Sequence, residues 1–251
     1  MDGEKELDGR VALVTGAGRN IGRAIALELA AGGAAIVVNA RGNMDEAKRV
    51  AGEIEAAGGQ ALAVIGDVAD ATAVNAMVDA AVARLSRIDY LVNNAAMRGE
   101  KPLQDMTYAE WRSVLDVTLD GAFHCVKACL PHLKQSGAGA IVNMGGLSAH
   151  AGSKDRAHVL TAKSGLAGFT RALACDLAGD NVTVNCVAPG LVATARAKDF
   201  VEPQHHAIHH SLSGKRGSPQ DIATLVRFLC GPGARYITGQ TIHASGGAFL
   251  T

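Results

Sequence analysis

The sequence predicts a single α/β domain, built as a Rossmann-type, doubly wound parallel sheet of about seven strands flanked by helices. Short apolar runs typical of buried strands alternate with helical patterns along the whole 251-residue chain. The composition is rich in alanine, glycine and valine and only 4% aromatic, which suits close packing of helices on strands. No linker-like stretch and no repeat of known period divides the sequence, so we expect residues 1–251 to form one domain.

The first strand and the first helix flank a glycine-rich turn. Val11–Val14 is an apolar strand, and the turn after it carries Gly16, Gly18 and Gly22 before a helical pattern begins. Glycines let a backbone approach phosphates, and a helix N-terminus offers unpaired N–H groups and the positive end of a dipole. The spacing is one residue longer than the common dinucleotide fingerprint. Taken alone, the turn is consistent with a phosphate site or with a tight turn that binds nothing.

The remaining elements continue the alternation of strand and helix. We expect further strands at 35–39, 61–65, 89–93, 140–144, 182–188 and 240–244. We expect further helices at about 44–57, 71–85, 111–133, 160–177 and 222–229. Residues 193–217 form an excursion between the sixth strand and the last helix.

Charge and cysteine content exclude several classes of function. Lysine plus arginine equals aspartate plus glutamate at 24 each, so no net charge favours nucleic acid or an acidic membrane surface. The N-terminus is acidic without an apolar signal segment, and no apolar run is long enough to cross a bilayer. The five cysteines form no C-x-x-C pair and are typical of reduced thiols. We expect a cytoplasmic protein that binds neither nucleic acid nor membrane.

Five short motifs resemble the short-chain dehydrogenase/reductase family over nearly the whole chain. Residues 15–22 resemble its T-G-x-x-x-G-x-G turn, with Asn20 at the middle glycine, a residue that tolerates left-handed backbone. The other motifs are Asp67-Val68, which resembles the adenine-contacting pair; 93–96, which resembles N-N-A-G; Pro189-Gly190 with Thr194, which resembles the nicotinamide-holding segment; and the C-terminal 245–247. The resemblance implies an oxidoreductase that uses a nicotinamide dinucleotide.

The resemblance also implies which residues hold the cofactor. They are Gly16, Arg19, Asn20, Ile21, Gly22, Arg41, Asp67, Val68, Asn94, Ala95, Lys163, Pro189, Gly190, Val192 and Thr194. An acid at the end of the second strand would bind the ribose 2′-hydroxyl of NAD, but Ala40 stands there and Arg41 follows. Two guanidiniums without a carboxylate favour NADP(H) over NAD(H). The alternative is that Arg19 and Arg41 are simply solvated.

The resemblance fails at the catalytic positions, which predicts an atypical member of the family. The family uses a Tyr four residues before a Lys, a Ser thirteen residues before that Tyr, and an Asn on the preceding long helix. Lys163 matches the Lys, whereas Val159, Gly146 and Thr118 stand at the Tyr, Ser and Asn positions. Valine cannot protonate an alkoxide, and general acid–base catalysis contributes about 10²–10⁴-fold.

The loop at 147–158 contains the residues that could replace the missing groups. We take Lys163, His150 and Ser148 as the candidate catalytic residues, with His150 as the leading acid because it follows the vacant Ser position closely. His158 precedes the Tyr position, so on a helix it points about a quarter-turn away. For both histidines the alternative of a loop residue without chemistry stays open.

The excursion at 193–217 corresponds to the family's substrate lid. His205 with His209, and His206 with His210, have a zinc-like spacing, but no third ligand accompanies them, and we expect no metal site. They are better explained as residues of a moving lid. Cationic residues near the site in the family layout favour an anionic small-molecule substrate: Arg98, Lys154, Arg156, Arg196 and Lys198.

Three functions remain open on the sequence. The leading one is an oxidoreductase acting on a small carbonyl, alcohol or enone with a non-standard proton relay. The second is a non-redox lyase or isomerase on the same scaffold. The third is a non-catalytic dinucleotide-binding subunit. The family commonly assembles through its two long helices and its C-terminal strand, so the resemblance implies a homo-tetramer or homo-dimer.

Overall fold

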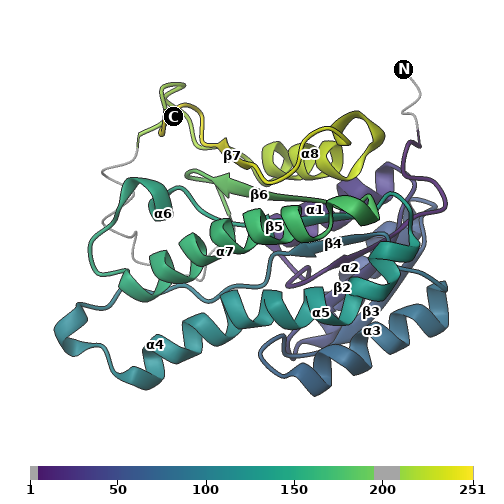
Figure 1. Ribbon diagram of the computed structural model, residues 1–251, viewed down its shortest axis with the longest axis horizontal. Helices are drawn as coiled ribbons and strands as arrows, with labels where there is room; N and C mark the ends of the chain where they lie inside the picture. Colours follow the sequence, from purple (N-terminus) through teal and green to yellow (C-terminus); the bar gives the residue numbers. More distant parts are fainter. Residues whose placement is uncertain (1–4, 195–209, 251) are drawn as a thin grey trace.

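Seven parallel strands form one twisted sheet in the order β3-β2-β1-β4-β5-β6-β7 (Figure 1). The structure is a computed structural model that describes residues 5–194 and 210–250. The strands are β1 Val11–Val14, β2 Ala35–Ala40, β3 Ala61–Ile65, β4 Tyr90–Asn93, β5 Ala140–Met144, β6 Thr183–Pro189 and β7 Thr241–Ala244. The predicted fold class is therefore confirmed, with each expected strand present.

Helices cover both faces of the sheet. They are α1 Asn20–Ala31, α2 Met44–Ala56, α3 Ala71–Leu85, α4 Tyr108–Leu115, α5 Gly121–Gln135, α6 Ser148–Ala151, α7 Ala157–Asp176 and α8 Pro219–Cys230. Short 3₁₀ turns occur at η1 Leu103–Asp105, η3 Ala178–Asp180 and η5 Pro232–Ala234. No helix within 5–194 and 210–250 is both long and apolar enough to cross a membrane.

The strands are apolar throughout because each strand faces a core on both sides. In β1, the side chains of Ala12 and Val14 join the core under α1, α2 and α8, whereas Leu13 joins the core under α3 and α5. Successive side chains of a strand point to opposite faces, so a sheet covered on both faces needs an unbroken apolar run. This explains why the strands were visible as continuous runs in the sequence.

The predicted long helix at 111–133 contains a turn of different geometry. The chain runs from α4 through a π-helical turn, η2 Asp116–Asp120, directly into α5. Arg112 bonds the carboxylates of Asp116 and Asp120 on the outer side of this turn. Thr118 lies within the turn and is buried. Such π-turns are rare and often mark functional positions.

A buried carboxylate ties the amino ends of the central strands together. Asp89, which is fully buried, accepts hydrogen bonds from Arg10 (2.9 Å), Arg87 (2.6 Å), Ser136 (2.5 Å) and the backbone N–H of Val11 (2.9 Å). Burial alone would raise the pKa of Asp89, but the bonds from Arg87, Ser136 and Arg10 hold it below its ordinary value. This cluster lies at the end of the sheet opposite to the predicted site.

The strand order changes direction between β1 and β4. In a sheet of this kind, a ligand site is expected at the carboxyl ends of these two strands. β1 pairs with β2 on one side and with β4 on the other. The connections that leave the carboxyl ends of β1 and β4 therefore go to opposite faces and leave a crevice between them. The loop after β5, with α6, lies at the same end of the sheet (Figure 1).

Candidate active site

The turn after β1 is held to the end of β4 by a network centred on Thr15. The Thr15 hydroxyl donates to the carbonyl of Val92 (3.3 Å) and accepts from the backbone N–H groups of Asn94 and Ala95 (both 3.0 Å). The Asn94 side-chain amide donates to the carbonyls of Thr15 (2.9 Å) and Gly16 (3.0 Å). Asn94 and Ala95 thus fix the turn from the neighbouring strand.

Two glycines of the turn have no room for a side chain. A Cβ on Gly22 would lie 2.3 Å from the carbonyl oxygen of Gly16 and 2.5 Å from the Asn94 amide nitrogen. Gly16 has φ +61°, and a Cβ there would lie 3.1 Å from the Cα of Ala95. Asn20, where the family has a glycine, adopts φ +51°, the left-handed conformation that asparagine tolerates. The turn geometry expected from the sequence is therefore kept.

A buried asparagine that the sequence analysis missed supports the same turn. Asn39, near the end of β2, accepts through Oδ1 from the N–H of Gly16 (3.2 Å) and through its carbonyl from the N–H of Ala17 (2.8 Å). Its amide donates to the carbonyl of Gly66 after β3 (3.1 Å). A polar residue inside an otherwise apolar strand was the available signal.

Two arginines flank the turn on its exposed side. Arg19 is the N-cap residue of α1, and Arg41 follows β2 directly. Both are exposed, and within the described part of the chain neither guanidinium has a hydrogen bond or an ion pair. Ile21, in the first turn of α1, is 7% exposed and packs into the core on that side.

The predicted adenine-contacting pair lies after β3 and against the start of α5. The Asp67 carboxylate accepts from the N–H of Ala69 (3.0 Å), which stabilises a tight turn. Val68 is buried, and a Cβ on Gly121 would lie 2.7 Å from its Cγ2. The His124 ring approaches the carbonyl of Val68 with Nδ1 at 3.1 Å. Close packing against α5 therefore fixes Asp67 and Val68 directly after the carboxyl end of β3.

The end of β6 is packed between the loop after β5 and the end of β7. The carbonyl of Pro189 accepts from the N–H of Leu147 (3.0 Å), and the N–H of Gly190 donates to Ala244 of β7 (3.0 Å). A Cβ on Gly190 would lie 2.7 Å from the Cα of Ser245. The motifs Pro189-Gly190 and 245–247 are thus packed directly on each other.

The segment after Gly190 leads into the predicted lid. Val192 is 8% exposed and forms a parallel bridge with Gly217, while Thr194, half-buried, ends the first described range. Five predicted lid residues lie outside the described residues: Arg196, Lys198, His205, His206 and His209. His210 is described and exposed. Within the described residues, no group of three or more His, Cys, Asp or Glu is placed to hold a metal ion.

Lys163 projects from α7 toward the end of β5. Its ammonium donates a hydrogen bond to the carbonyl of Met144, the last residue of that strand. Burial, together with the positive charges of Arg98 and Arg156, lowers the pKa of Lys163 to about 7. Near neutral pH this amine therefore exists in both protonation states.

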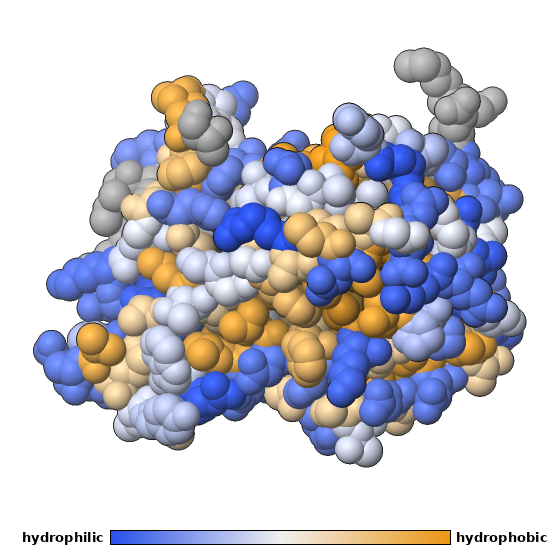
Figure 2. Space-filling model, in the orientation of Figure 1, coloured by the Kyte–Doolittle hydropathy of each residue, from blue (hydrophilic) through white to orange (hydrophobic). Residues whose placement is uncertain are grey.

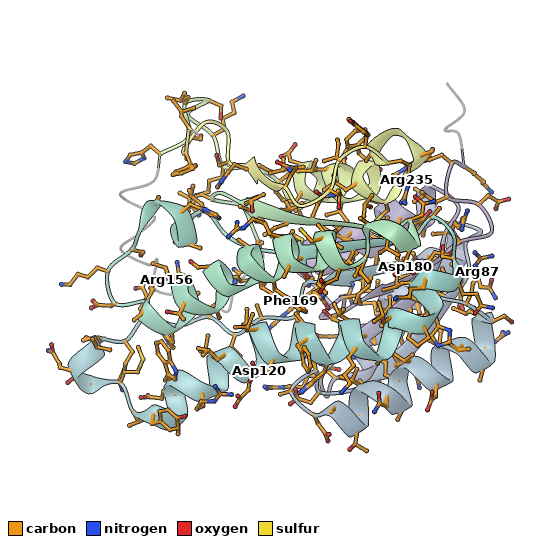
Figure 3. All side chains as sticks on the ribbon, viewed as in Figure 1. Arg87, Asp120, Arg156, Phe169, Asp180 and Arg235 are labelled. Atoms are coloured by element: carbon orange, nitrogen blue, oxygen red, sulfur yellow. The ribbon has the colours of Figure 1, made fainter. Side chains whose placement is uncertain are left out.

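Ser148 and Arg156 form a contact across the loop that follows β5. Arg156 is 9% exposed and precedes α7 (Figure 3), and its Nη1 donates to the Ser148 hydroxyl at 3.1 Å. Burial lowers the pKa of Arg156, and the charge of Arg98 acts in the same direction, whereas Glu100 opposes it. The contact leaves the Ser148 proton able to donate to another acceptor.

His150 packs against the C-terminal part of the chain. Its ring lies edge-on to that of His243 in β7, with centroids 4.6 Å apart, and 5.9 Å from the Phe249 ring. Nε2 of His150 and Nδ1 of His243 are buried and have no hydrogen-bond partner among the described residues. Burial lowers the pKa of both histidines, and the charge of Arg171 lowers that of His150 further. Both rings are therefore neutral at neutral pH.

Comparison with known proteins gives the family. Residues 16–248 match a family model described as Enoyl-(Acyl carrier protein) reductase. The chain is 38% identical over 240 residues to a 3-oxoacyl-[acyl-carrier-protein] reductase of Staphylococcus aureus, covering 95% of this chain and 98% of that one. It is 42% identical over 245 residues to the short-chain reductase protein NovJ of Streptomyces niveus, covering 94% and 93%.

The chain belongs to the short-chain dehydrogenase/reductase family. A solved structure of a dehydrogenase/reductase from Sinorhizobium meliloti 1021 superposes with a TM-score of 0.92 at 35% identity, covering 98% of each chain. The family is thus established for this chain, and the two curated relatives named here are reductases.

The three positions that correspond to the family's Ser, Tyr and Asn lie just after β5, in α7 and in the π-turn η2. No described atom lies within 4 Å of a Cβ built on Gly146, so this position opens onto free space. Val159, one turn before Lys163, is 4% exposed and packs with Val114. Thr118 accepts from the N–H of Met97 at 3.3 Å.

His158, the second candidate histidine, lies on the opposite side of the loop from His150. It is 4% exposed, and its Nε2 lies 3.5 Å from the position of a Cβ on Gly99, in the loop after β4. Burial lowers its pKa, and the charge of Arg156 adds to this effect. Sequence spacing could not distinguish the surroundings of the two histidines. Their neighbours, in β7 for His150 and in the loop after β4 for His158, are distant in the chain.

Proposed function

We propose that this protein is an NADP(H)-dependent oxidoreductase that acts on a small carbonyl, alcohol or enone substrate without the family's tyrosine. The observation that carries the proposal is the conformation of the turn after β1. Thr15, Asn39 and Asn94 hold its backbone by hydrogen bonds, and there is no room for a side chain at Gly22. A cradle that a single Cβ would fill suits close approach of a pyrophosphate to a helix N-terminus. The residues present therefore fit a dinucleotide.

We assign the cofactor-binding residues expected from the sequence to a single site at the carboxyl ends of the strands. Gly16, Asn20 and Gly22 would face the pyrophosphate, Asp67 and Val68 the adenine, and Pro189 and Gly190 the nicotinamide. A bound nicotinamide supplies or accepts a hydride. The residues of this chain bind the dinucleotide, exclude water and handle the proton.

The preference for NADP(H) rests on charge at the end of β2. Ala40 ends the strand where an acid would select a ribose 2′-hydroxyl, and the exposed guanidiniums of Arg19 and Arg41 stand on the same side. A guanidinium pairs with a phosphate through two parallel hydrogen bonds. NADH lacks that phosphate and should bind more weakly.

The proton relay is proposed to use Lys163, Ser148 and His150. Lys163 holds an exchangeable proton near neutral pH and reaches the end of β5. The Ser148 hydroxyl is oriented and polarised by Arg156, so its O–H can donate to a developing alkoxide. His150 lies two residues beyond Ser148, and its lowered pKa favours the neutral imidazole. In that state it can accept a proton from Ser148 when an alcohol is oxidised, and it must first take up a proton from solvent to act as the acid when a carbonyl is reduced.

Fluorescence titration followed by a substrate screen tests this proposal. The purified protein is titrated with NADPH and with NADH, and carbonyls and enones are then screened by loss of the reduced-nicotinamide absorbance. We expect saturable binding, tighter for NADPH, and turnover that falls in Lys163→Ala. Absence of binding would refute the cofactor assignment, and unchanged turnover in His150→Ala would remove His150 from the relay.

A non-catalytic or non-redox role is the second candidate. It is favoured by Val159, which lies in an apolar cluster with Val114, Leu115 and Ala162 and supplies no proton. Binding of NADPH without turnover of any carbonyl or enone would support this second candidate over the first.

We also propose that the protein assembles as a homo-tetramer or homo-dimer through α5 and α7. Apolar atoms gather over the face that these helices form (Figure 2), and Phe123 of α5 is 49% exposed beside Phe169 of α7, with ring centroids 6.5 Å apart. Exposed apolar patches of this kind mark protein interfaces. Light scattering should give an oligomeric mass that Phe123→Glu lowers, and a monomeric wild-type protein would contradict the proposal.

A further inference from the structure

Two cationic side chains make contacts on either side of Gly146, a position that opens onto free space, and a third lies close enough to act on their charges. Lys163 reaches the end of β5 from α7, and Arg156 reaches Ser148 from the segment before α7. Arg98 is in the loop after β4, and a backbone hydrogen bond of 2.6 Å from Lys101 to Asp155 joins that loop to the segment of Arg156. This backbone hydrogen bond holds the segment that carries Arg98 beside the segment that carries Arg156.

The electrostatic coupling between these groups supports the same placement. Apart from burial, the charge of Arg98 lowers the pKa of both Lys163 and Arg156, and the charge of Arg156 lowers that of Lys163. Like charges that perturb each other in a partly buried site repel, and an anion placed between them relieves this repulsion. Glu100 offsets part of the charge on Arg156.

We propose that these residues form a carboxylate-binding subsite, so that the substrate is a small oxo acid or unsaturated acid whose carboxylate pairs with Arg156 and Arg98. The inference rests on the proposed function, since it names the substrate class of that same site. A guanidinium carries five N–H donors in a planar fork, so Arg156 can hold the Ser148 hydroxyl and a carboxylate together.

Burial makes Arg156 the specificity-determining residue of the pair. It is 9% exposed, so its interaction with an anion is less screened by solvent than that of the exposed Arg98. A neutral amide of the same shape brings no negative charge to the cationic residues, whereas a carboxylate does. We therefore expect discrimination between an acid and its amide to depend mainly on Arg156 and to a smaller extent on Arg98.

A matched pair of probes tests the subsite without requiring turnover. Acetoacetate and its neutral counterpart acetoacetamide are titrated into the protein by ligand-observed NMR, with and without NADP⁺. We expect acetoacetate to bind about tenfold more tightly than acetoacetamide, an order of magnitude that a charge-assisted bidentate contact supports. Arg156→Gln should abolish this preference and Arg98→Gln should reduce it, in both cases through weaker binding of acetoacetate, and acetoacetamide binding should stay unchanged in Arg98→Gln.

Arg84→Gln is the control because it removes the same charge from an exposed position on α3. If Arg156→Gln does not fold, Arg98→Gln, on the surface, carries the test. Equal binding of acid and amide by the wild type would overturn the proposal, as would inorganic phosphate competing as strongly as acetoacetate. A preference for the acid without any NADP⁺ binding would retain the subsite and refute the proposed function, so the two failures are distinguishable.

Discussion

Two regions of the molecule differ in how tightly they are packed. In the first region, at the carboxyl ends of β1 and β4, side chains and backbone are joined by hydrogen bonds. In the second region, at the end of β5 and the start of α7, several of the described polar groups lack such bonds. Thr15 and Asn94 exchange hydrogen bonds across the first region, and Gly22 leaves no space for a methyl group. In the second region Gly146 opens onto free space, and buried nitrogens of His150 and His158 have no hydrogen-bond partner among the described residues. The first region is determined by packing, and the second retains room for different chemistry.

The difference shows how binding and chemistry can be separated on one scaffold. The cofactor turn depends on backbone conformation, so changes there alter the fold locally. Chemistry at the catalytic positions depends on the end groups of a few side chains and not on the backbone. Val159 therefore lies in an apolar cluster while α7 remains a continuous helix. Under the proposed function, the same sheet would carry proton donors other than the family's tyrosine without a change of fold.

The largest expected effect comes from rebuilding the family's catalytic groups. The variant Gly146→Ser, Val159→Tyr and Thr118→Asn should raise turnover of a carbonyl substrate by about 10²–10⁴-fold, the usual contribution of general acid–base catalysis. A Ser at Gly146 meets no described atom, whereas Tyr at the packed Val159 position should lower stability. Steady-state kinetics measure the gain, and Lys163→Ala in the rebuilt protein is the control. A folded, NADPH-binding variant without any gain would contradict the account.

A second prediction concerns Asp89, whose hydrogen bonds join the amino ends of the strands that carry both regions. Asp89→Asn should lower the free energy of unfolding by about 3 kcal/mol, the low end for breaking a buried pair, because Arg10 and Arg87 are partly exposed. The pKa of Asp89 is lowered in the folded state, so its stabilisation is present above the ordinary pKa and is lost as pH falls through the lowered value.

Urea unfolding between neutral and acidic pH measures this effect. The acid-induced loss of stability should be smaller in Asp89→Asn than in the wild type, while the affinity of the folded protein for NADPH stays the same. Loss of NADPH affinity without loss of stability would contradict this prediction, because it would show that the Asp89 cluster affects the cofactor site.

A third prediction sharpens the claim that packing determines the first region. Gly22→Ala should lower stability by about 1–3 kcal/mol, since its Cβ overlaps the Gly16 carbonyl, and should weaken NADPH binding at least about tenfold. Gly52→Ala in α2 is the matched control. Outside its chain neighbours and the backbone of α2 itself, no described atom lies within 4 Å of its Cβ, so this change should stabilise the helix by about 0.5–1 kcal/mol. Similar melting temperatures for the two variants would contradict the prediction.

The smallest effect is expected at the exposed edge of the turn. Arg41→Ala should weaken NADPH binding by roughly tenfold, the loss of one charge-assisted phosphate contact, and leave NADH binding unchanged. Arg84→Ala, exposed on α3, serves as the control for net charge. Parallel fluorescence titrations measure both cofactors, and an equal loss for NADH and NADPH would assign Arg41 a structural role instead.

The sequence predicted what local patterns determine and missed what depends on distant contacts. Continuous apolar strands and the left-handed Asn20 follow from neighbouring residues, and both are confirmed. The contact of His150 with His243 joins segments far apart in the chain, and the π-turn at Asp116–Asp120 leaves no periodic signal in a helical pattern. The catalytic end was therefore harder to predict than the cofactor end.

Fluorescence titration of the wild-type protein and of Gly22→Ala with NADPH tests the central claim most directly. That claim is that the turn after β1 is a preserved dinucleotide site joined to an altered catalytic end. The account predicts saturable NADPH binding by the wild type and binding at least about tenfold weaker in Gly22→Ala. Binding of the same strength by the two proteins, or no binding by the wild type, would contradict it.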